Sequence, residues 1–176
     1  HYEYDFQVIK KIAQSNNWNP TELGGVVQDI SSFARQAYVD KVMSFIDLNE
    51  LKRLKIIVNS GNGAAGPTFD AIAEIFNKKK SPVEFIRMHH NPDHTFPNGI
   101  PNPILTKNHG PMRQMVLRHN ADFGVAFDGD FDRCFFFDEK GKFVSGEYIV
   151  GFLASVFLDK EPYAQIVHDP RVIWNI

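Results

Sequence analysis

The chain has 176 residues, of which 43% are hydrophobic and 23% charged, and its formal net charge is −2 at pH 7. This length suits one full domain, alone or with pieces of its neighbours, and the composition argues against a disordered chain. The small net charge gives no electrostatic case for a nucleic acid or a membrane surface as partner, and no apolar run is long enough to span a bilayer. The single cysteine, Cys134, suits a reducing compartment, so we expect a cytoplasmic protein.

Two helices are predicted in the first third of the chain. Apolar residues recur at helical spacing over 5–17, and a polar segment at 19–25 reads as a linker. A second helix is predicted over 33–46, with Ser31 or Ser32 as its cap. The residues predicted to face inward are Phe33, Ala37, Val42 and either Phe45 or Ile46.

A strand, a glycine-rich turn, a helix and a second strand follow in order. The strands are predicted at 54–59 and 83–88, the turn at 60–66, and the helix from Pro67 to about Asn77. This order predicts a βαβ unit with parallel strands and a right-handed crossover.

The remainder begins with a proline-containing loop at 89–108, for which we expect an ordered, stiff path. A short helix is predicted at 111–119, strands at 123–127 and 134–138, and a turn at 139–142. A last helix is predicted at 147–159, with its inward residues at Ile149, Phe152, Leu153, Val156 and Phe157. The segment 164–169 reads as a terminal strand that would need partners, and the chain begins without a methionine. We therefore expect a piece of a longer protein.

The turn Asp128-Gly129-Asp130-Phe131-Asp132-Arg133 carries the clearest chemical signal. Its three acids occupy every second position after a buried strand, and alternate residues of an extended chain point the same way. Crowded carboxylates favour a hard divalent cation such as Mg²⁺, and Arg133 adds a planar fork of donors for a phosphate. A solvated loop is the plain alternative. A calcium-binding hand fails, because Arg133 stands where that loop needs glycine and because strands flank the turn.

Two other motifs have weaker readings. Gly61-x-Gly63-x-x-Gly66 fits the dinucleotide fingerprint in the required strand-to-helix context, but small residues in a tight turn explain it more simply. The loop histidines His89, His90 and His94 lack the cysteines or helical spacing of a zinc site.

The acidic turn resembles the magnesium loop of the α-D-phosphohexomutase family, and within it of the bacterial phosphomannomutase/phosphoglucomutase group. Asn59–Pro67 looks like the opening turn of that family's second domain, 96–103 is similar to its proline-rich loop, and His168–Arg171 resembles the start of its third domain. The resemblance implies a three-layer α/β/α domain with a mixed, mainly parallel sheet. It also implies a layout in which 1–30 ends domain one, 31–142 forms domain two and 143–176 begins domain three.

Such enzymes move a phosphoryl group between the 1- and 6-hydroxyls of mannose or glucose through a phosphoserine and a bisphosphate intermediate. The resemblance implies Mg²⁺ on Asp128, Asp130 and Asp132, Arg133 as a catalytic residue and Arg171 as a contact to the bound hexose phosphate. The phosphoserine turn, the sugar loop of domain three and the phosphate loop of domain four have no match, so the chain alone is expected to be inactive. Two alternatives stay open, a nucleotide-binding module using Gly61–Gly66 and a magnesium-dependent phosphatase.

Overall fold

The computed structural model describes residues 2–16 and 24–169, and the chain forms two compact units, 1–33 and 34–176. The first unit contains α1 (Tyr2–Ser15), a helix predicted from the apolar spacing of 5–17. Its apolar side chains, such as Phe6 and Ile9, are exposed. In the described part of the chain, no helix combines the length and apolar character that crossing a bilayer requires.

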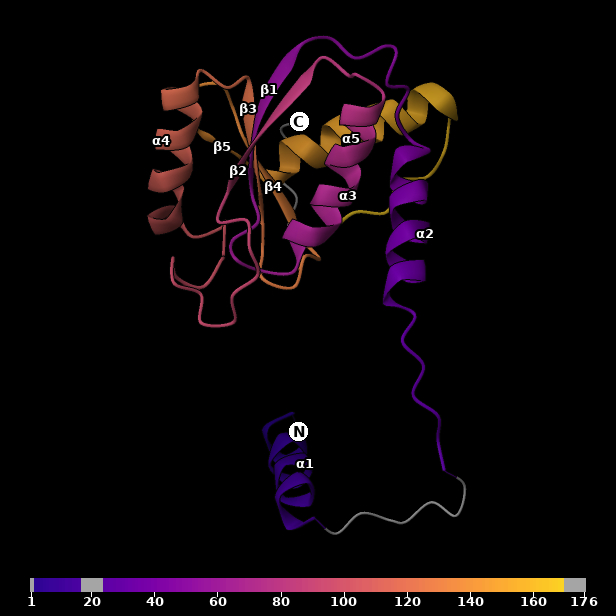
Figure 1. The fold of residues 1–176 in the computed structure, drawn as a ribbon, viewed down its shortest axis with the longest axis vertical. Helices are drawn as coiled ribbons and strands as arrows, with labels where there is room; N and C mark the ends of the chain where they lie inside the picture. Colours follow the sequence, from indigo (N-terminus) through magenta and orange to yellow (C-terminus); the bar gives the residue numbers. More distant parts are fainter. Residues whose placement is uncertain (1, 17–23, 170–176) are drawn as a thin grey trace. The chain divides into compact units, whose positions relative to one another are not determined.

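The second unit is built on a five-stranded mixed sheet (Figure 1). The strands are β1 (Leu54–Asn59), β2 (Val83–Met88), β3 (Phe123–Phe127), β4 (Cys134–Phe137) and β5 (Phe143–Val144). Their order is β2-β1-β3-β4-β5; β1 pairs in parallel with both β2 and β3, whereas β4 is antiparallel to β3 and β5. The predicted bounds of β1, β2 and β3 are confirmed. β5 was not predicted, and its residues Phe143 and Val144 extend the sheet beyond position 142, where the second domain was expected to end.

Two helices cover opposite faces of this sheet and give the predicted three layers (Figure 1). On one face, α4 (His109–His119) packs Met112 and Val116 against Ile57 of β1. On the other, α3 (Ala65–Lys78) packs Phe69 and Ala73 against Ile56 and Val58 of the same strand. Neighbouring residues of β1 thus serve two cores, because successive side chains of a strand point to opposite faces.

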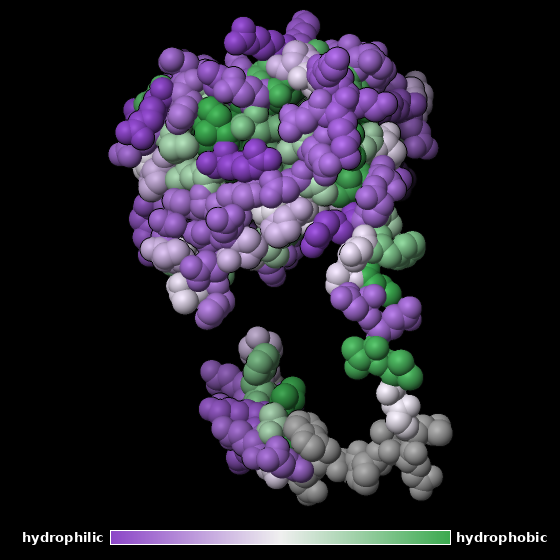
Figure 2. Space-filling model, viewed as in Figure 1, coloured by the Kyte–Doolittle hydropathy of each residue, from purple (hydrophilic) through white to green (hydrophobic). Residues whose placement is uncertain are grey.

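The predicted inward faces of two helices are confirmed only in part, because Val42, Ile149 and Val156 are half-buried and the other side chains predicted to face inward are exposed. In α2 (Ser31–Met43) the only buried residue is Val39, and Phe33 is 74% exposed. In α5 (Gly146–Lys160) no residue is buried, and Phe152 is 64% exposed. Apolar spacing shows which side chains share a helix face, but burial requires another element packed against that face, which the spacing does not reveal. On the face shown in Figure 2, hydrophobic residues accordingly interrupt a mainly hydrophilic surface.

The predicted terminal strand at 164–169 is also wrong, because this segment has no regular secondary structure. A strand forms only where a neighbour accepts and donates its backbone hydrogen bonds, and no described strand pairs with it. The predicted substrate contact, Arg171, lies outside the described residues.

The long loop at 89–108 follows a cross-linked path and ends in a short 3₁₀ turn, η1 (Thr106–Asn108). Asn62, in the glycine-rich turn, is the main anchor. Its side-chain amide donates to Asn91 O at 2.8 Å, its side-chain oxygen accepts from the Asn98 amide at 2.8 Å, and its carbonyl accepts from Asp93 N at 2.8 Å. The glycine turn and the proline-containing loop therefore hold each other in place.

Candidate metal centre

The acidic loop joins β3 to β4 and is closed at its base by two hydrogen bonds. Asp128 N donates to Arg133 O at 3.4 Å, and Arg133 N donates to Asp128 Oδ1 at 3.1 Å. Asp128 directly follows β3 and is 1% exposed, whereas the side chain of Asp132 is 67% exposed. The loop thus presents one buried carboxylate at the sheet edge and an open rim.

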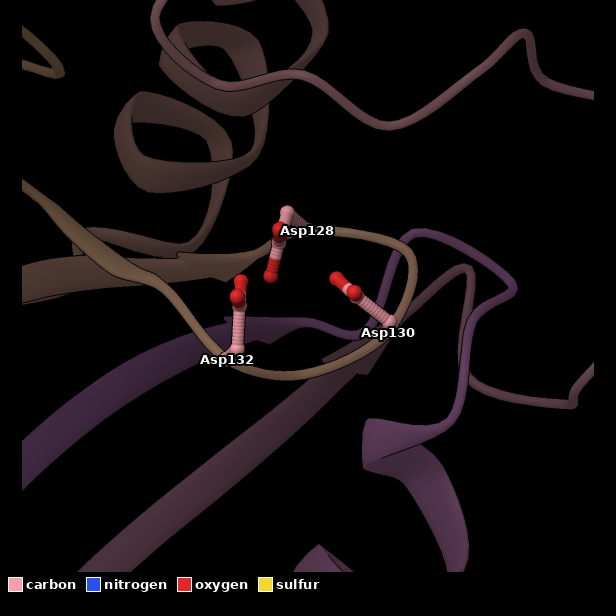
Figure 3. Close-up of side chains that lie close together, drawn as sticks. All are labelled: Asp128, Asp130 and Asp132. Carbon is pink, nitrogen blue, oxygen red and sulfur yellow. The ribbon is translucent and has the colours of Figure 1, made fainter. Parts of the chain in front are cut away.

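The three carboxylates converge on one point inside the loop (Figure 3). One oxygen from each of Asp128, Asp130 and Asp132 lies within 4.8 Å of the others, and in the described part of the chain these residues form the only such group of potential metal ligands. The predicted convergence is present, but the predicted reason for it is wrong. The segment does not continue as an extended strand; it curls, with φ of +67° at Phe131, and the curl turns the acids inward.

The three acids differ in their electrostatic environment. Burial raises the pKa of Asp128, but the backbone N–H of Arg133, the neighbouring acids and the Arg133 charge together hold that pKa below its ordinary value of 3.8. Its own backbone N–H lowers the pKa of Asp130, but the Asp128 and Asp132 carboxylates outweigh it, and the net pKa is raised. The lowered pKa keeps Asp128 ionised, whereas the raised pKa of Asp130 reflects repulsion from the two neighbouring carboxylates.

Arg133 supplies the nearest positive charge. Its Nη2 lies 2.5 Å from Asp128 Oδ2, and its Nε donates to Asp132 Oδ1 at 3.1 Å. The carboxylate of Asp132 and then that of Asp128 raise the pKa of this guanidinium. Because its side chain is 53% exposed, Arg133 can offer the remaining donors of its fork to a ligand over the loop.

The donor set fits a hard divalent cation. Despite the ion pair to Arg133, the buried Asp128 Oδ2 receives no hydrogen bond from any described group. The guanidinium of Arg133 already places one positive charge against this oxygen, but it leaves the crowding of the three carboxylates only partly neutralised. Three carboxylates are oxygen ligands of the type that Mg²⁺ prefers, and the exposed rim leaves room for water or phosphate oxygens. Asp128, Asp130 and Asp132 can therefore hold Mg²⁺.

The glycine-rich turn supports the acidic loop from the side. Ala64 N donates to Gly129 O at 3.0 Å. A Cβ added at Gly63 would lie 2.9 Å from Gly129 Cα and nearer still to the Gly129 carbonyl oxygen, and one at Gly66 would clash with His90 O. The protein's own backbone fills the space that these two glycines leave open. The arrangement favours the structural reading of Gly61-x-Gly63-x-x-Gly66 over a pyrophosphate site.

His89, His90 and His94, for which the sequence does not favour a zinc site, form no ligand group within the described residues. His90 Nε2 instead lies 2.8 Å from Asp70 Oδ2, in a pair that links the loop to α3.

Two residues important to the site were missed in the sequence. Phe131 is given no role in the sequence-based prediction, and nothing in the sequence indicates its φ of +67°. Asn62 is given no separate role there either, although an Asn-Gly pair commonly marks a left-handed position, and its φ is +57°.

Comparisons with known proteins match this architecture. The family model described as phosphoglucomutase/phosphomannomutase, alpha/beta/alpha domain II, matches residues 36–141. A phosphomannomutase of Salmonella montevideo is 51% identical and one of Escherichia coli 50% identical, each over 169 residues that make up 95% of this chain and 37% of the relative. A solved phosphoglucomutase/phosphomannomutase family protein of Burkholderia thailandensis is 26% identical with a TM-score of 0.71, covering 90% of this chain and 32% of that one. The chain thus spans about 37% of the length of the curated relatives it matches.

Proposed function

The chain belongs to the phosphoglucomutase/phosphomannomutase family, and we propose that it is the magnesium-binding domain of a phosphomannomutase. The complete enzyme would interconvert the 1- and 6-phosphates of mannose, or of glucose, through a phosphoserine and a bisphosphate intermediate. The observation that carries the proposal is the convergence of three aspartates beside Arg133 in a chain half identical to phosphomannomutases.

The proposed division of labour follows from the loop. Asp128, Asp130 and Asp132 hold Mg²⁺, with Asp128 supplying the fixed charge because the sheet edge buries it. When bound, the ion supplies electrostatic stabilisation to the phosphoryl group being transferred. Arg133 is the catalytic residue, since its half-exposed guanidinium can donate to phosphate oxygens above the loop. Arg171 is proposed as a contact to the hexose phosphate.

The remaining parts of the enzyme are proposed to come from outside this chain. No segment carries a phosphoserine turn, and the chain spans only about 37% of its relatives. The proposed layout assigns 1–30 to the end of domain one, 31–142 to domain two and 143–176 to the start of domain three. We propose that the chain by itself is inactive as a mutase and that the complete enzyme works in the cytoplasm.

The test uses the complete enzyme that carries this chain. Conversion of mannose 1-phosphate to mannose 6-phosphate is measured for the unmodified enzyme, for Asp130→Asn and after magnesium is chelated. We expect the unmodified enzyme to be active and both treatments to abolish conversion, with activity of the chelated sample restored by added Mg²⁺. Full activity of Asp130→Asn would contradict the metal assignment, and absence of mutase activity from the unmodified enzyme would contradict the proposal as a whole.

One control addresses the phosphatase alternative. That reading requires the 176-residue chain alone to hydrolyse a simple phosphate ester in the presence of Mg²⁺. The mutase proposal predicts no hydrolysis under these conditions.

A further inference from the structure

Phe131 occupies an unusual backbone conformation at the centre of the acidic loop. Its φ of +67° lies in the left-handed region, which glycine and asparagine adopt readily and which bulky side chains rarely do. Such a conformation persists only where surrounding contacts hold it. The contacts of the Phe131 ring therefore indicate what maintains the shape of the loop.

The ring contacts two aromatic side chains from different elements. It meets Phe127, the last residue of β3, with ring centroids 4.8 Å apart and planes at 85°. It also meets Tyr38 of α2, with centroids 6.2 Å apart and planes at 63°. Both are edge-to-face arrangements, which add a favourable electrostatic term to apolar contact. The three rings form a bridge, defined here as Tyr38–Phe131–Phe127, that runs from α2 through the acidic loop to the sheet.

The bridge contacts Phe131, the residue whose backbone conformation determines where Asp130 and Asp132 lie relative to each other. Asp130 precedes Phe131 and Asp132 follows it, so the φ of Phe131 sets the direction of the second half of the loop relative to the first. Asp128 needs no such help, because burial and the Arg133 backbone N–H already fix it. The two exposed acids are the ones whose placement depends on the ring.

We propose that Phe131 is a positioning residue for the metal centre and that Tyr38 of α2 holds it there. The inference rests on the proposed function, because it assigns a role toward the ion that the three aspartates bind. Tyr38 is 48% exposed and meets Phe131 at the protein surface, and the one buried side chain of α2 is its neighbour Val39. The helix thereby couples its own placement to the geometry of the carboxylates, although it contributes no metal ligand.

The test is a titration of the complete protein with Mn²⁺, with free Mn²⁺ counted by electron paramagnetic resonance. Tyr38→Ala removes the ring and should weaken Mn²⁺ binding about two- to tenfold, the range expected for loss of one aromatic pair. Tyr38→Phe keeps the ring and should bind within twofold of the unmodified protein. Because Phe131 and Tyr38 act through one contact, Tyr38→Ala combined with Phe131→Ala should bind no more weakly than Phe131→Ala alone.

A matched control separates the bridge from general loosening of α2. Val39→Ala shortens the one fully buried side chain of that helix and leaves Tyr38 in place. It should lower the thermal unfolding temperature and leave Mn²⁺ binding within twofold. Equal weakening by Val39→Ala and Tyr38→Ala would overturn the role of the ring, and so would strictly additive losses in the Tyr38/Phe131 double variant.

A second readout needs no metal. Hydrogen exchange at the Arg133 amide, which donates to Asp128 Oδ1, reports closure of the loop. We expect faster exchange in Tyr38→Ala and unchanged exchange in Tyr38→Phe; unchanged exchange in Tyr38→Ala would contradict the bridge. If the unmodified protein binds no Mn²⁺ although Tyr38→Ala speeds exchange, the metal proposal fails and the bridge stands as a structural contact without the inferred role.

Discussion

Gly63 and Gly129 lie so close together that neither the glycine-rich turn nor the acidic loop can shift alone. A Cβ on Gly63 would meet the Gly129 Cα at 2.9 Å, and the Ala64 N–H that follows donates to the Gly129 carbonyl at 3.0 Å. Two loops that are 66 residues apart in sequence therefore meet through backbone atoms. The turn after β1 acts as a support for the metal centre after β3.

Gly63→Ala is expected to destabilise the protein and disturb the acidic loop. The added methyl has no flexible side chain to displace, only backbone, so we expect a loss of about 1–3 kcal/mol in the free energy of unfolding. Mn²⁺ binding should weaken in parallel, because the Gly129 peptide lies between Asp128 and Asp130. Urea unfolding and Mn²⁺ titration measure the two effects.

Gly110→Ala is the matched control for that substitution. A Cβ there would meet nothing within 4 Å, and the residue lies in the first turn of α4. Alanine should leave stability unchanged or raise it by up to about 1 kcal/mol. Equal losses from the two glycine variants would contradict the close contact between the loops.

Asp70 gives a stability prediction with a defined pH dependence. On α3, its Oδ1 accepts from Arg87 Nε at 2.9 Å, and its Oδ2 lies 2.8 Å from His90 Nε2. Burial raises the pKa of Asp70, but the bonds from His90 and Arg87 outweigh burial and bring it below 3.8. A depressed carboxyl pKa contributes stability above the unfolded pKa, and this stability is lost as the pH falls through the folded pKa.

Asp70→Asn should therefore cost about 0.5–1 kcal/mol at pH 7, a small value because the side chain is half exposed. The difference from the unmodified protein should shrink as the pH falls below about 3.8, as measured by urea unfolding across pH. Glu74→Gln, which breaks an exposed pair with Lys78, serves as the control with little expected change. A stability gap that stays constant down to pH 3 would rule out the charged form of Asp70 as its cause.

The three parallel strands could be predicted from the sequence because their signals are local. β1, β2 and β3 are mainly apolar runs bounded by polar or glycine residues, and each contributes buried or half-buried side chains to the core. β5 could not be read in the same way, because Phe143–Val144 is strand only through pairing with Phe136 and Phe137 of β4. The segment 164–169 shows the converse, a strand-like pattern without a partner.

The same division holds for the candidate site. The identity and spacing of Asp128, Asp130 and Asp132 are visible in the sequence, and the acids do converge. The geometry that brings them together depends on the φ of Phe131 and on Tyr38, which is 93 residues earlier in the chain. Composition and spacing identify candidate ligands, whereas contacts between distant segments decide how the ligands are aimed.

Arg133→Lys should lower mutase turnover in the complete enzyme while keeping the positive charge. Lysine replaces a planar fork, which here reaches Asp128 and Asp132 together, with a single ammonium group. If Arg133 also donates to the phosphoryl group, kcat should fall about 10²-fold, near the effect of removing one stabilising donor. Arg118→Lys, an exposed change on α4, should leave kcat unchanged. Wild-type kcat in Arg133→Lys would remove Arg133 from the proposed machinery.

Asp130→Asn should separate stability from metal binding, because the three acids repel one another when no cation lies between them. The substitution removes one of three converging negative charges at an exposed position where no packing is lost. Without divalent cations, the variant should therefore unfold at a slightly higher temperature than the unmodified protein. With Mg²⁺ added, the order should reverse, since only the unmodified protein gains the stabilisation that a bound ion confers on the folded state.

Thermal unfolding with chelator and with millimolar Mg²⁺ measures both halves of this prediction. Glu139→Gln, at an exposed acid of the next turn, removes the same unit of negative charge and should show the same rise with Mg²⁺ as the unmodified protein. An Asp130→Asn variant that is less stable in chelator and still rises with Mg²⁺ would mean that Asp130 is held by contacts within the protein and does not serve as a ligand.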